Sequence, residues 1–318
     1  MGDLALAVDI GGTKLAAGLI AADGTVVARV QRPTRLNHEI QDVAAQSDHG
    51  GDGAERLWRD LEALVRDVVG AVPAADRLVV CGVGCGGPMT PGGEEVSPLN
   101  ISVWRSFPLR SRLADATGLP TFVDYDAKAL ELGEGWVGAA VGARNYIAMV
   151  VSTGVGGGIV LDGRLLGGRL GNAGHIGHVV VEPEGRPCAC GGRGCLEAEA
   201  SGTAITAVTG QPARLAPPAV VRRVGTLVGR AVASVVNLLD LPLAVASGSV
   251  ALGFGEPFFR AAQDEMDLRC GLSFARGARI VPGALGDRGP LIGAARVGLI
   301  GVGAEAETSA EARAEVAG

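Results

Sequence analysis

The chain has 318 residues, a mass of 32.0 kDa and a formal charge of 28 − 34 = −6. This length is enough for two ordinary domains, or one large one, with a buried core. The 51 glycines and 3% aromatic content exclude a coiled coil, 47% hydrophobic content excludes a disordered chain, and the mild acidity excludes a general attraction to nucleic acid or anionic lipid.

The first part of the chain predicts a strand meander followed by a helix and another strand. Apolar runs separated by glycine turns indicate the strands, and apolar residues at helical spacing indicate the helix. The polar, glycine-bearing segment 37–53 has no periodicity and predicts a mobile loop. The expected elements are strands at 4–10, 15–20, 25–30 and 78–83 and a helix at 54–72.

The same pattern returns in the second part of the chain. Again an apolar strand runs into a glycine turn, and a second strand and an Asp-Gly turn follow. Such a repeat predicts a duplicated α/β domain with a cleft between the copies. The expected elements are strands at 121–123, 146–152, 159–161 and 243–246, and helices at 127–138, 220–239 and 291–298.

Domain boundaries follow from this repeat. We expect a small N-terminal α/β domain at 1–121, joined by a C-terminal helix at 290–302, and a larger α/β domain at 122–289. The polar Ala/Glu segment 303–318 is expected to be a flexible tail. No stretch of 18 residues lacks a charge or a glycine, so no membrane-spanning helix is expected, and the N-terminus has no signal-peptide pattern.

Two glycine turns carry the clearest functional signal. Glycine lets backbone N–H groups approach an anion because no Cβ intervenes, so two such turns in equivalent halves indicate phosphate binding. Asp9 ends the first strand, where it could hold Mg²⁺ through water. The chain has no Walker-type motif. The candidate residues are Asp9, Gly11, Gly12, Thr13 and Lys14 at the first turn, and Thr153, Gly154 and Gly156 at the second.

One imidazole and three thiols lie close together in the sequence. His178, Cys188, Cys190 and Cys195 offer the ligand set of a closed, tetrahedral structural Zn²⁺ site. The other three cysteines lie far apart. A reducing compartment with one metal cluster therefore fits better than three disulfides, and we expect a cytoplasmic protein.

Several motifs in order resemble the ROK family of sugar kinases, repressors and related proteins. They are Asp-Ile-Gly-Gly-Thr-Lys at 9–14, Thr-Gly-Val-Gly-Gly-Gly at 153–158, Gly-Asn-Ala-Gly-x-x-Gly-His at 171–178 and Cys-x-Cys-Gly-Gly-x-Gly-Cys-Leu-Glu at 188–197. The resemblance implies the α/β actin-like ATPase fold, with two RNase H-like domains, sugar in the interdomain cleft and ATP on the glycine turns. It also places Gly248 and Ser249 on the adenosine side.

By the same resemblance, Asp126 is the catalytic base that accepts a proton from the sugar hydroxyl. Its position at a strand-to-helix junction by itself favours a helix N-cap, at Asp124 or Asp126, and only the motif register favours catalysis. Lys128, one of two lysines in the chain, is expected to be a solvated helix residue rather than a ligand.

The resemblance also identifies sugar-binding positions, and two of them depart from the family pattern. His178 and Glu197 match, whereas Tyr125 stands in place of an asparagine and His175 in place of a glutamate. Those two positions contact the C2 and C3 side of the sugar in the family, so recognition there is expected to differ while chemistry at C6 is kept. Gly87 and Asn100 are further candidate sugar contacts.

The expected activity is ATP- and Mg²⁺-dependent phosphorylation of a hexose or amino-hexose at C6. Two altered positions favour a sugar modified at C2 or C3, such as kanosamine, and an ordinary glucokinase is the alternative. A non-catalytic, sugar-responsive regulator is a third reading, disfavoured because only eight residues precede Asp9 and leave no room for a helix-turn-helix domain. We expect no nucleic-acid or membrane partner, and a homo-oligomer, either a dimer or a tetramer, as is common in the family.

Overall fold

The chain divides into two compact units, each built around a five-stranded mixed sheet. A computed structural model describes residues 2–34 and 50–317. The first unit comprises Met1–Gly133 and Arg288–Gly318, and the second comprises Glu134–Asp287. The boundary therefore lies further along the chain than the position after residue 121 expected from the sequence.

The first sheet has the order β3-β2-β1-β4-β5. Its central strand, β1, pairs antiparallel with β2 and parallel with β4, and β4 pairs parallel with β5. Because parallel neighbours end at the same edge of the sheet, the carboxyl ends of β1, β4 and β5 lie side by side. The strands are β1 (Asp3–Ile10), β2 (Lys14–Ala21), β3 (Val26–Pro33), β4 (Arg77–Cys85) and β5 (Thr121–Tyr125).

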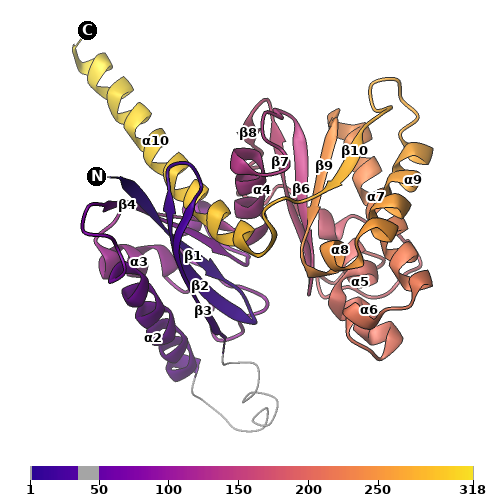
Figure 1. Ribbon diagram of the computed structural model, residues 1–318, viewed down its shortest axis with the longest axis horizontal. Coiled ribbons are helices and arrows are strands. Elements are labelled where there is room, and N and C mark those ends of the chain that lie inside the picture. Colours follow the sequence, from indigo (N-terminus) through magenta and orange to yellow (C-terminus); the bar gives the residue numbers. More distant parts are fainter. Residues whose placement is uncertain (1, 35–49, 318) are drawn as a thin grey trace. The chain divides into compact units, whose positions relative to one another are not determined.

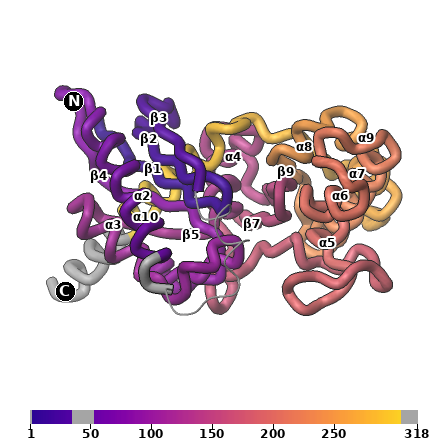
Figure 2. The backbone as a smooth tube through the Cα atoms, turned by 90° about the horizontal axis from the view of Figure 1, so that it is seen from below, coloured from indigo at the N-terminus to yellow at the C-terminus, as the bar shows by residue number. Residues whose placement is uncertain are grey.

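Helices cover both faces of the first sheet. Helices α2 (Gly50–Val69) and α3 (Leu109–Thr117) lie on one face, and α10 (Gly289–Ala317) lies on the other (Figure 1). The α2 and α3 side holds the main apolar core, which includes Trp58, Trp104 and Phe107. Figure 2 shows the same unit from below, with α3 next to β4.

Two expectations about this unit need correction. Helix α2 begins at Gly50, so the end of the loop expected at 37–53 is helical, while residues 37–49 lie outside the described residues. Helix α10 continues to Ala317, beyond the helix end expected near residue 302. The Ala- and Glu-rich composition of this segment explains the difference, because both residues have high helix propensity.

The second sheet has the order β10-β9-β6-β7-β8 and repeats the connectivity of the first. Its central strand, β6, pairs antiparallel with β7 and parallel with β9, as β1 does with β2 and β4. The predicted duplication of an α/β domain is therefore confirmed. The strands are β6 (Tyr146–Val151), β7 (Val155–Leu161), β8 (Arg164–Leu165), β9 (Leu243–Ser247) and β10 (Arg279–Pro282).

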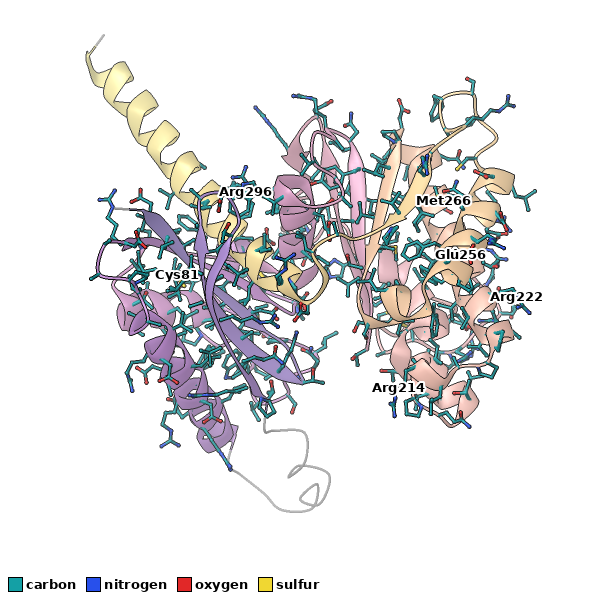
Figure 3. The ribbon with its side chains drawn as sticks, viewed as in Figure 1. Cys81, Arg214, Arg222, Glu256, Met266 and Arg296 are labelled. Atoms are coloured by element: carbon teal, nitrogen blue, oxygen red, sulfur yellow. The ribbon has the colours of Figure 1, made fainter. Side chains whose placement is uncertain are left out.

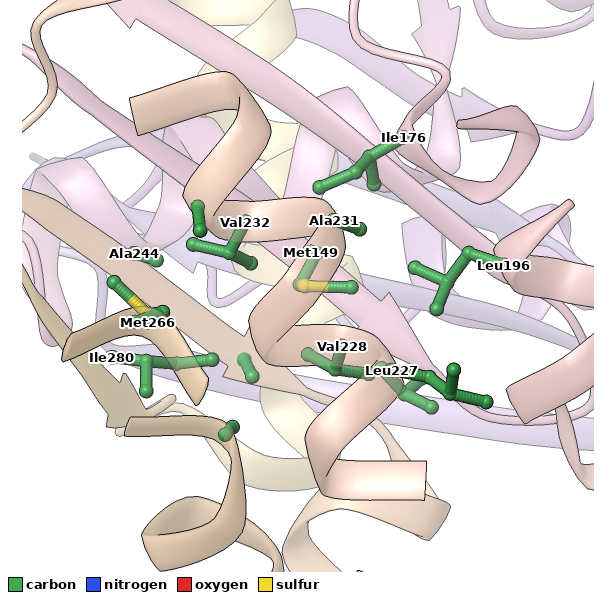
Figure 4. Close-up of a cluster of buried hydrophobic side chains, with 14 of the residues drawn as sticks. Met149, Ile176, Leu196, Leu227, Val228, Ala231, Val232, Ala244, Met266 and Ile280 are labelled. Carbon is green, nitrogen blue, oxygen red and sulfur yellow. The ribbon is translucent and has the colours of Figure 1, made fainter. Parts of the chain in front are cut away.

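The apolar core of the second unit includes side chains of α7 and α9, two helices that pack against each other. Met149 and Met266 are fully buried there, together with valines and alanines of α7 (Figure 4). Figure 3 labels Met266 on α9 and Arg222 on α7, of which the first is buried and the second exposed. The helices of this part of the chain are α4 (Asp126–Val137), which starts in the first unit, α5 (Leu196–Ala200), α6 (Gly202–Thr209), α7 (Pro218–Leu239), α8 (Ser249–Phe254) and α9 (Glu256–Arg269).

The glycine run at 154–158 differs from the turn expected from the sequence. Only 152–154 form a bend, and β7 begins at Val155, with Gly156 and Gly157 paired to β6. These glycines serve close packing in a strand, because a Cβ on Gly157 would lie 3.0 Å from the Ala148 carbonyl oxygen and 3.0 Å from Ile176. None of the helices among the described residues is long and apolar enough to cross a membrane.

Candidate active site

The carboxyl ends of three parallel strands bring the first group of candidate residues together. The register pairs Asp9 of β1 with Gly84 of β4, and Gly84 with Asp124 of β5. A Cβ on Gly84 would lie 3.4 Å from the Asp126 Cα atom. Ligand sites in α/β proteins form at such strand ends, since the following loops converge there. Asp9 and Asp126, which are far apart in sequence, therefore lie close together in the first unit.

Burial and a like charge dominate the electrostatics of Asp9. Its side chain is only 6% exposed. Burial, and after it the negative charge of Asp126, raise the pKa of Asp9 to about 7, while Lys14 and Arg29 act in the opposite direction. A nearby cation would lower the pKa of such a carboxyl group and so restore its ionised form.

The first glycine turn connects β1 to β2 and is held by its own backbone. The Gly11 amide donates to the Lys14 carbonyl oxygen at 2.9 Å. Thr34, which follows β3, donates from its hydroxyl to the Gly11 carbonyl oxygen at 2.8 Å and from its amide to the Thr13 carbonyl oxygen at 3.0 Å. The sequence did not single out Thr34, because its burial after the edge strand β3 is a property of the folded chain.

Asn100 lies against this turn. A Cβ on Gly12 would lie 3.1 Å from the Asn100 Nδ2 atom, and one on Gly86 would lie 3.2 Å from its Oδ1 atom. The residue is exposed. Its amide, with two donors and an acceptor, is therefore available beside the glycine turn, next to the Gly86-Gly87 segment.

Asp126 begins helix α4, directly after β5. Its Oδ1 atom accepts from the Ala127 amide at 2.7 Å, and Asp124 Oδ1 similarly accepts from the Tyr125 amide at 2.8 Å. Asp126 is partly exposed. Neither bond is the N-cap contact, which goes to an amide two or three residues on. One oxygen of Asp126 is engaged with the backbone, and a carboxylate has further acceptor sites.

Tyr125 is buried against the Gly87 segment. It is 6% exposed, and a Cβ on Gly87 would overlap its ring. Burial raises the pKa of Tyr125, and a hydrogen bond from the Met89 backbone acts in the opposite direction. The Cδ1, Cε1 and Cζ side of the ring therefore packs against this segment, and its hydroxyl is engaged with the Met89 backbone.

The expectation that Lys128 is solvated is wrong. It is 2% exposed, and its Nζ atom lies 4.0 Å from Asp124 Oδ1 and 5.7 Å from the centroid of the Tyr125 ring. Residue 128 lies on the inner face of α4, which the amphipathic pattern of this short helix does not reveal. A buried ammonium needs such partners because an isolated charge is costly to desolvate.

The second group of candidate residues lies in the second unit. At the end of β6, the Val155 amide donates to Glu197 Oε2 at 2.9 Å, and a Cβ on Gly154 would lie 2.8 Å from the same oxygen. The Thr153 carbonyl oxygen accepts from the Thr203 hydroxyl at 2.9 Å. Glu197, expected to contact sugar, thus also holds the second glycine turn.

The motif expected on the adenosine side lies next to this turn. Val150 of β6 pairs with Ser247 of β9, and the hydroxyl oxygens of Ser152 and Ser249 lie 2.9 Å apart. Gly248 has a φ of 96°, a conformation that favours glycine. The two loops expected to hold the nucleotide are thereby connected.

The His/Cys cluster is assembled within the second unit. The ligand atoms of His178, Cys188, Cys190 and Cys195 all lie within 4.8 Å of one another. The Cys190 and Cys195 sulfurs are 3.8 Å apart, the edge expected of a tetrahedron with Zn–S bonds of about 2.3 Å. His178 Nδ1 lies 3.7 Å from the Cys188 sulfur, so this nitrogen is the one facing the thiols. The donor set fits Zn²⁺, and the six cysteines, all within the described residues, form no disulfide.

His175 lies three residues before the cluster histidine and is exposed. Its Nδ1 atom is 2.9 Å from the Asn172 carbonyl oxygen, which can only accept. Nδ1 therefore carries the proton in this contact. Its ring is stacked with that of His178 at a centroid distance of 6.1 Å.

Glu134 is a second residue that the sequence did not single out. This fully buried carboxylate of α4 accepts from the Ala139 amide at 2.8 Å, the Ala284 amide at 3.1 Å and the Ser247 hydroxyl at 3.3 Å. It thereby ties the end of β9 to the loop after β10. Glu131 and Glu134, both fully buried, interrupt the apolar pattern of α4, and this interruption is the signal that could have found it.

Comparison with known proteins places these features in context. A family model described as "ROK family" matches residues 5–298. A glucokinase from Thermotoga maritima is 38% identical over 202 residues, which are 63% of this chain and 58% of that enzyme. An N-acetylmannosamine kinase from Escherichia fergusonii is 35% identical over 266 residues, which are 79% of this chain and 84% of the relative.

A solved structure extends the similarity to the fold. The ROK hexokinase from Thermus thermophilus superposes with a TM-score of 0.77 and 32% identity, over 94% of this chain and 99% of that one. The chain therefore has the actin-like ATPase fold of its structural neighbours. With the Thermotoga enzyme, however, the match spans less than two thirds of the relative's length.

Proposed function

Since the chain belongs to the ROK family, we propose that it is a sugar kinase that transfers a phosphoryl group from ATP to the C6 hydroxyl of a hexose or amino-hexose. The observation that carries the proposal is the convergence of Asp126, Asp9 and the first glycine turn at the ends of β1, β4 and β5. Phosphoryl transfer needs this combination of a proton acceptor, a phosphate-binding turn and a cation site.

Asp126 is the general base of the proposed reaction. It takes the proton of the C6 hydroxyl as that oxygen bonds to the γ-phosphorus, and the bond from phosphorus to the bridging oxygen of ADP breaks. Its engagement with the Ala127 amide fixes the carboxylate at the start of α4 and leaves acceptor capacity for the hydroxyl. Asn100, beside Gly12, would orient the sugar next to the phosphate turn.

The proposed cofactors have distinct places. Asp9 would hold Mg²⁺ through water, and its buried carboxyl fits a cation partner. Bound Mg²⁺ neutralises charge on the phosphates of ATP. The glycine turns at 11–12 and 153–154 would contact those phosphates through their amides, and Gly248 and Ser249 would line the adenosine side.

We infer that His178, Cys188, Cys190 and Cys195 hold a structural Zn²⁺. Four protein ligands leave no open position, so the ion's contribution is to order the loop that presents His175 and Glu197. The reduced thiols it requires favour a cytoplasmic protein. We also propose, by analogy with the family, that the protein forms a homo-oligomer.

The proposed substrate is a hexose modified at C2 or C3, such as kanosamine. Two positions that face this side of the sugar in the family carry different chemistry here, a buried phenol at Tyr125 and an imidazole at His175. Sites built around particular hydroxyls discriminate strongly against analogues. N-acetylmannosamine, the substrate named for one relative, is itself altered at C2.

An ordinary glucokinase is the second candidate, favoured by the glucokinase among the relatives. The test is a coupled assay with ATP and glucose, glucosamine, N-acetylmannosamine, mannose, fructose and kanosamine. A kcat/KM for glucose far above all others would establish the glucokinase and refute the modified-sugar proposal. A sugar-responsive regulator without catalysis would bind a sugar but turn over none of them.

Asp126→Asn is the decisive variant for the mechanism. It should lower kcat by about 10³-fold or more, because an amide cannot accept the hydroxyl proton. Zinc content and thermal stability should stay close to those of the parent protein. Asp115→Asn, an exposed aspartate of the same unit, is the matched control. Near-normal kcat in Asp126→Asn would remove Asp126 from the role of base.

A further inference from the structure

The buried Lys128 has no part in the proposed phosphoryl transfer, and its surroundings need an explanation. In a chain with 28 basic residues, it is 2% exposed, whereas most basic side chains stay at the surface. Taking an ammonium out of water is costly, so such a residue persists where its position serves the structure around it.

The environment of Lys128 is specific. Its Nζ atom lies 4.0 Å from Asp124 Oδ1, one helical turn earlier, and 5.7 Å from the centre of the Tyr125 ring. A cation above an aromatic face is attracted by the negative potential of that face, and desolvation strengthens the attraction. Lys128 therefore restrains both residues that immediately precede Asp126.

Tyr125 is also restrained by the Gly87 segment, in addition to Lys128. A Cβ on Gly87 would overlap the Tyr125 ring, so this glycine lets the ring pack closely against the backbone. The Tyr125 hydroxyl is engaged with the Met89 backbone. The ring is therefore contacted at its hydroxyl by the Met89 backbone, along one flank by Gly87 and over its face by the Lys128 ammonium.

We propose that Lys128 is a positioning residue that fixes the Tyr125 ring as a rigid wall of the hexose site, so that the pair selects the sugar by shape. This inference rests on the proposed sugar-kinase function. It assigns specificity to a buried lysine that touches no substrate, and it predicts that the phenol hydroxyl of Tyr125 is dispensable while the ring is not.

The first readout is kinetic. Lys128→Met keeps the apolar stem and removes the charge, and it should raise the KM for the best hexose by about tenfold, with the KM for ATP within about twofold of the parent. Tyr125→Phe should keep the parent's sugar selectivity. In a Tyr125→Leu background, Lys128→Met should raise the hexose KM no further, because no ring remains to be held.

Arg112→Met is the matched control. Arg112 is a cation of the same unit that lies 4.6 Å from the Trp58 ring centroid and bonds Glu55 Oε2 at 2.9 Å. Its loss removes a cation–aromatic contact and an ion pair away from Asp126. It should leave both KM values unchanged.

The second readout is independent of activity. The chain has two tyrosines, Tyr125 and Tyr146, so protein labelled with 3-fluorotyrosine gives two fluorine NMR resonances, assigned through Tyr125→Phe. Lys128→Met should shift or broaden the Tyr125 resonance alone, and Arg112→Met should move neither. If Lys128→Met does not fold, Lys128→Gln serves instead, since it also removes the charge and should move the same resonance and raise the hexose KM.

Three results would overturn the proposal. They are an unmoved Tyr125 resonance, equal rises in the hexose and ATP KM values together with lower thermal stability, or additive effects of Lys128→Met and Tyr125→Leu. If the parent protein phosphorylated no sugar, the proposed function would fail. The fluorine spectra and the hexose Kd from calorimetry would then still decide whether Lys128 holds the ring for sugar binding.

Discussion

Glu197 Oε2 accepts a hydrogen bond of 2.9 Å from the Val155 amide, so a residue at the start of α5 holds the glycine turn at the end of β6. Glu197 also follows Cys195, the last residue of the His/Cys cluster, by two positions. One carboxylate thereby connects the proposed zinc loop with the proposed phosphate turn, and we propose that its second oxygen contacts the sugar.

This connection predicts different effects for two substitutions of Glu197. Glu197→Ala loses both the sugar contact and the support of the turn, so kcat/KM for hexose and for ATP should each fall by about 10- to 100-fold. Glu197→Gln keeps an acceptor for the Val155 amide, so it should lower kcat/KM for the hexose while sparing that for ATP. Steady-state kinetics with each substrate varied, and Glu184→Gln of the same loop as an exposed control, distinguish the two. Equal effects of both variants on ATP would contradict the dual role.

The raised pKa of Asp9 predicts a pH-dependent stability. Burial places the pKa of this carboxyl at about 7 in the folded protein, above its ordinary value of 3.8. The folded state therefore binds more protons than the unfolded state between about pH 4 and 7, and the stability of the metal-free protein falls as pH rises through this range. Asp9→Asn removes this penalty, which is up to about 4 kcal/mol.

The measurement is the difference in unfolding free energy between Asp9→Asn and the parent, from denaturant titrations without Mg²⁺ at several pH values. The variant should gain stability relative to the parent from pH 4 to pH 7, while losing kinase activity. Asp115→Asn, at an exposed position, should show no such trend. A difference that does not change with pH would mean that Asp9 is not buried as an uncompensated carboxyl.

Removal of the proposed zinc should affect folding and sugar binding together. Elemental analysis should find about one zinc per chain, and Cys188→Ser should lower that content, the melting temperature and the affinity for hexose measured by calorimetry. Cys270→Ser, at a buried cysteine outside the cluster, should keep its zinc. A metal-free preparation with full stability and activity would rule out a structural zinc.

Tyr125→Asn should change the choice of sugar. The amide introduces donor and acceptor groups at a position that faces the C2 and C3 side in the family, and the loss of the ring opens space beside Gly87. We expect the ratio of kcat/KM for glucose to that for the best modified hexose to rise by about tenfold or more, at a cost of about 2–4 kcal/mol in stability. The sugar panel and thermal melts measure both. An unchanged ratio would show that Tyr125 does not determine specificity.

Much of the candidate site could be predicted from the sequence because its parts are local. The glycine turns, the strand-to-helix junction at Asp126 and the cluster from His178 to Cys195 each lie within a short segment, where residue type and spacing carry the chemistry. The strand pattern likewise predicted the duplicated α/β unit, since apolar runs between turns are a local property.

The tertiary structure decided which of these local parts meet. The proximity of Asp9 to Asp126 depends on the order and register of β1, β4 and β5, and the burial of Lys128 depends on which face of α4 is turned inward. Neither is encoded in the spacing of nearby residues, because sheet order arises from the free energy of packing the whole chain. The sequence by itself determined the chemical groups of this protein, and only the fold determined the neighbours that set their charge and position.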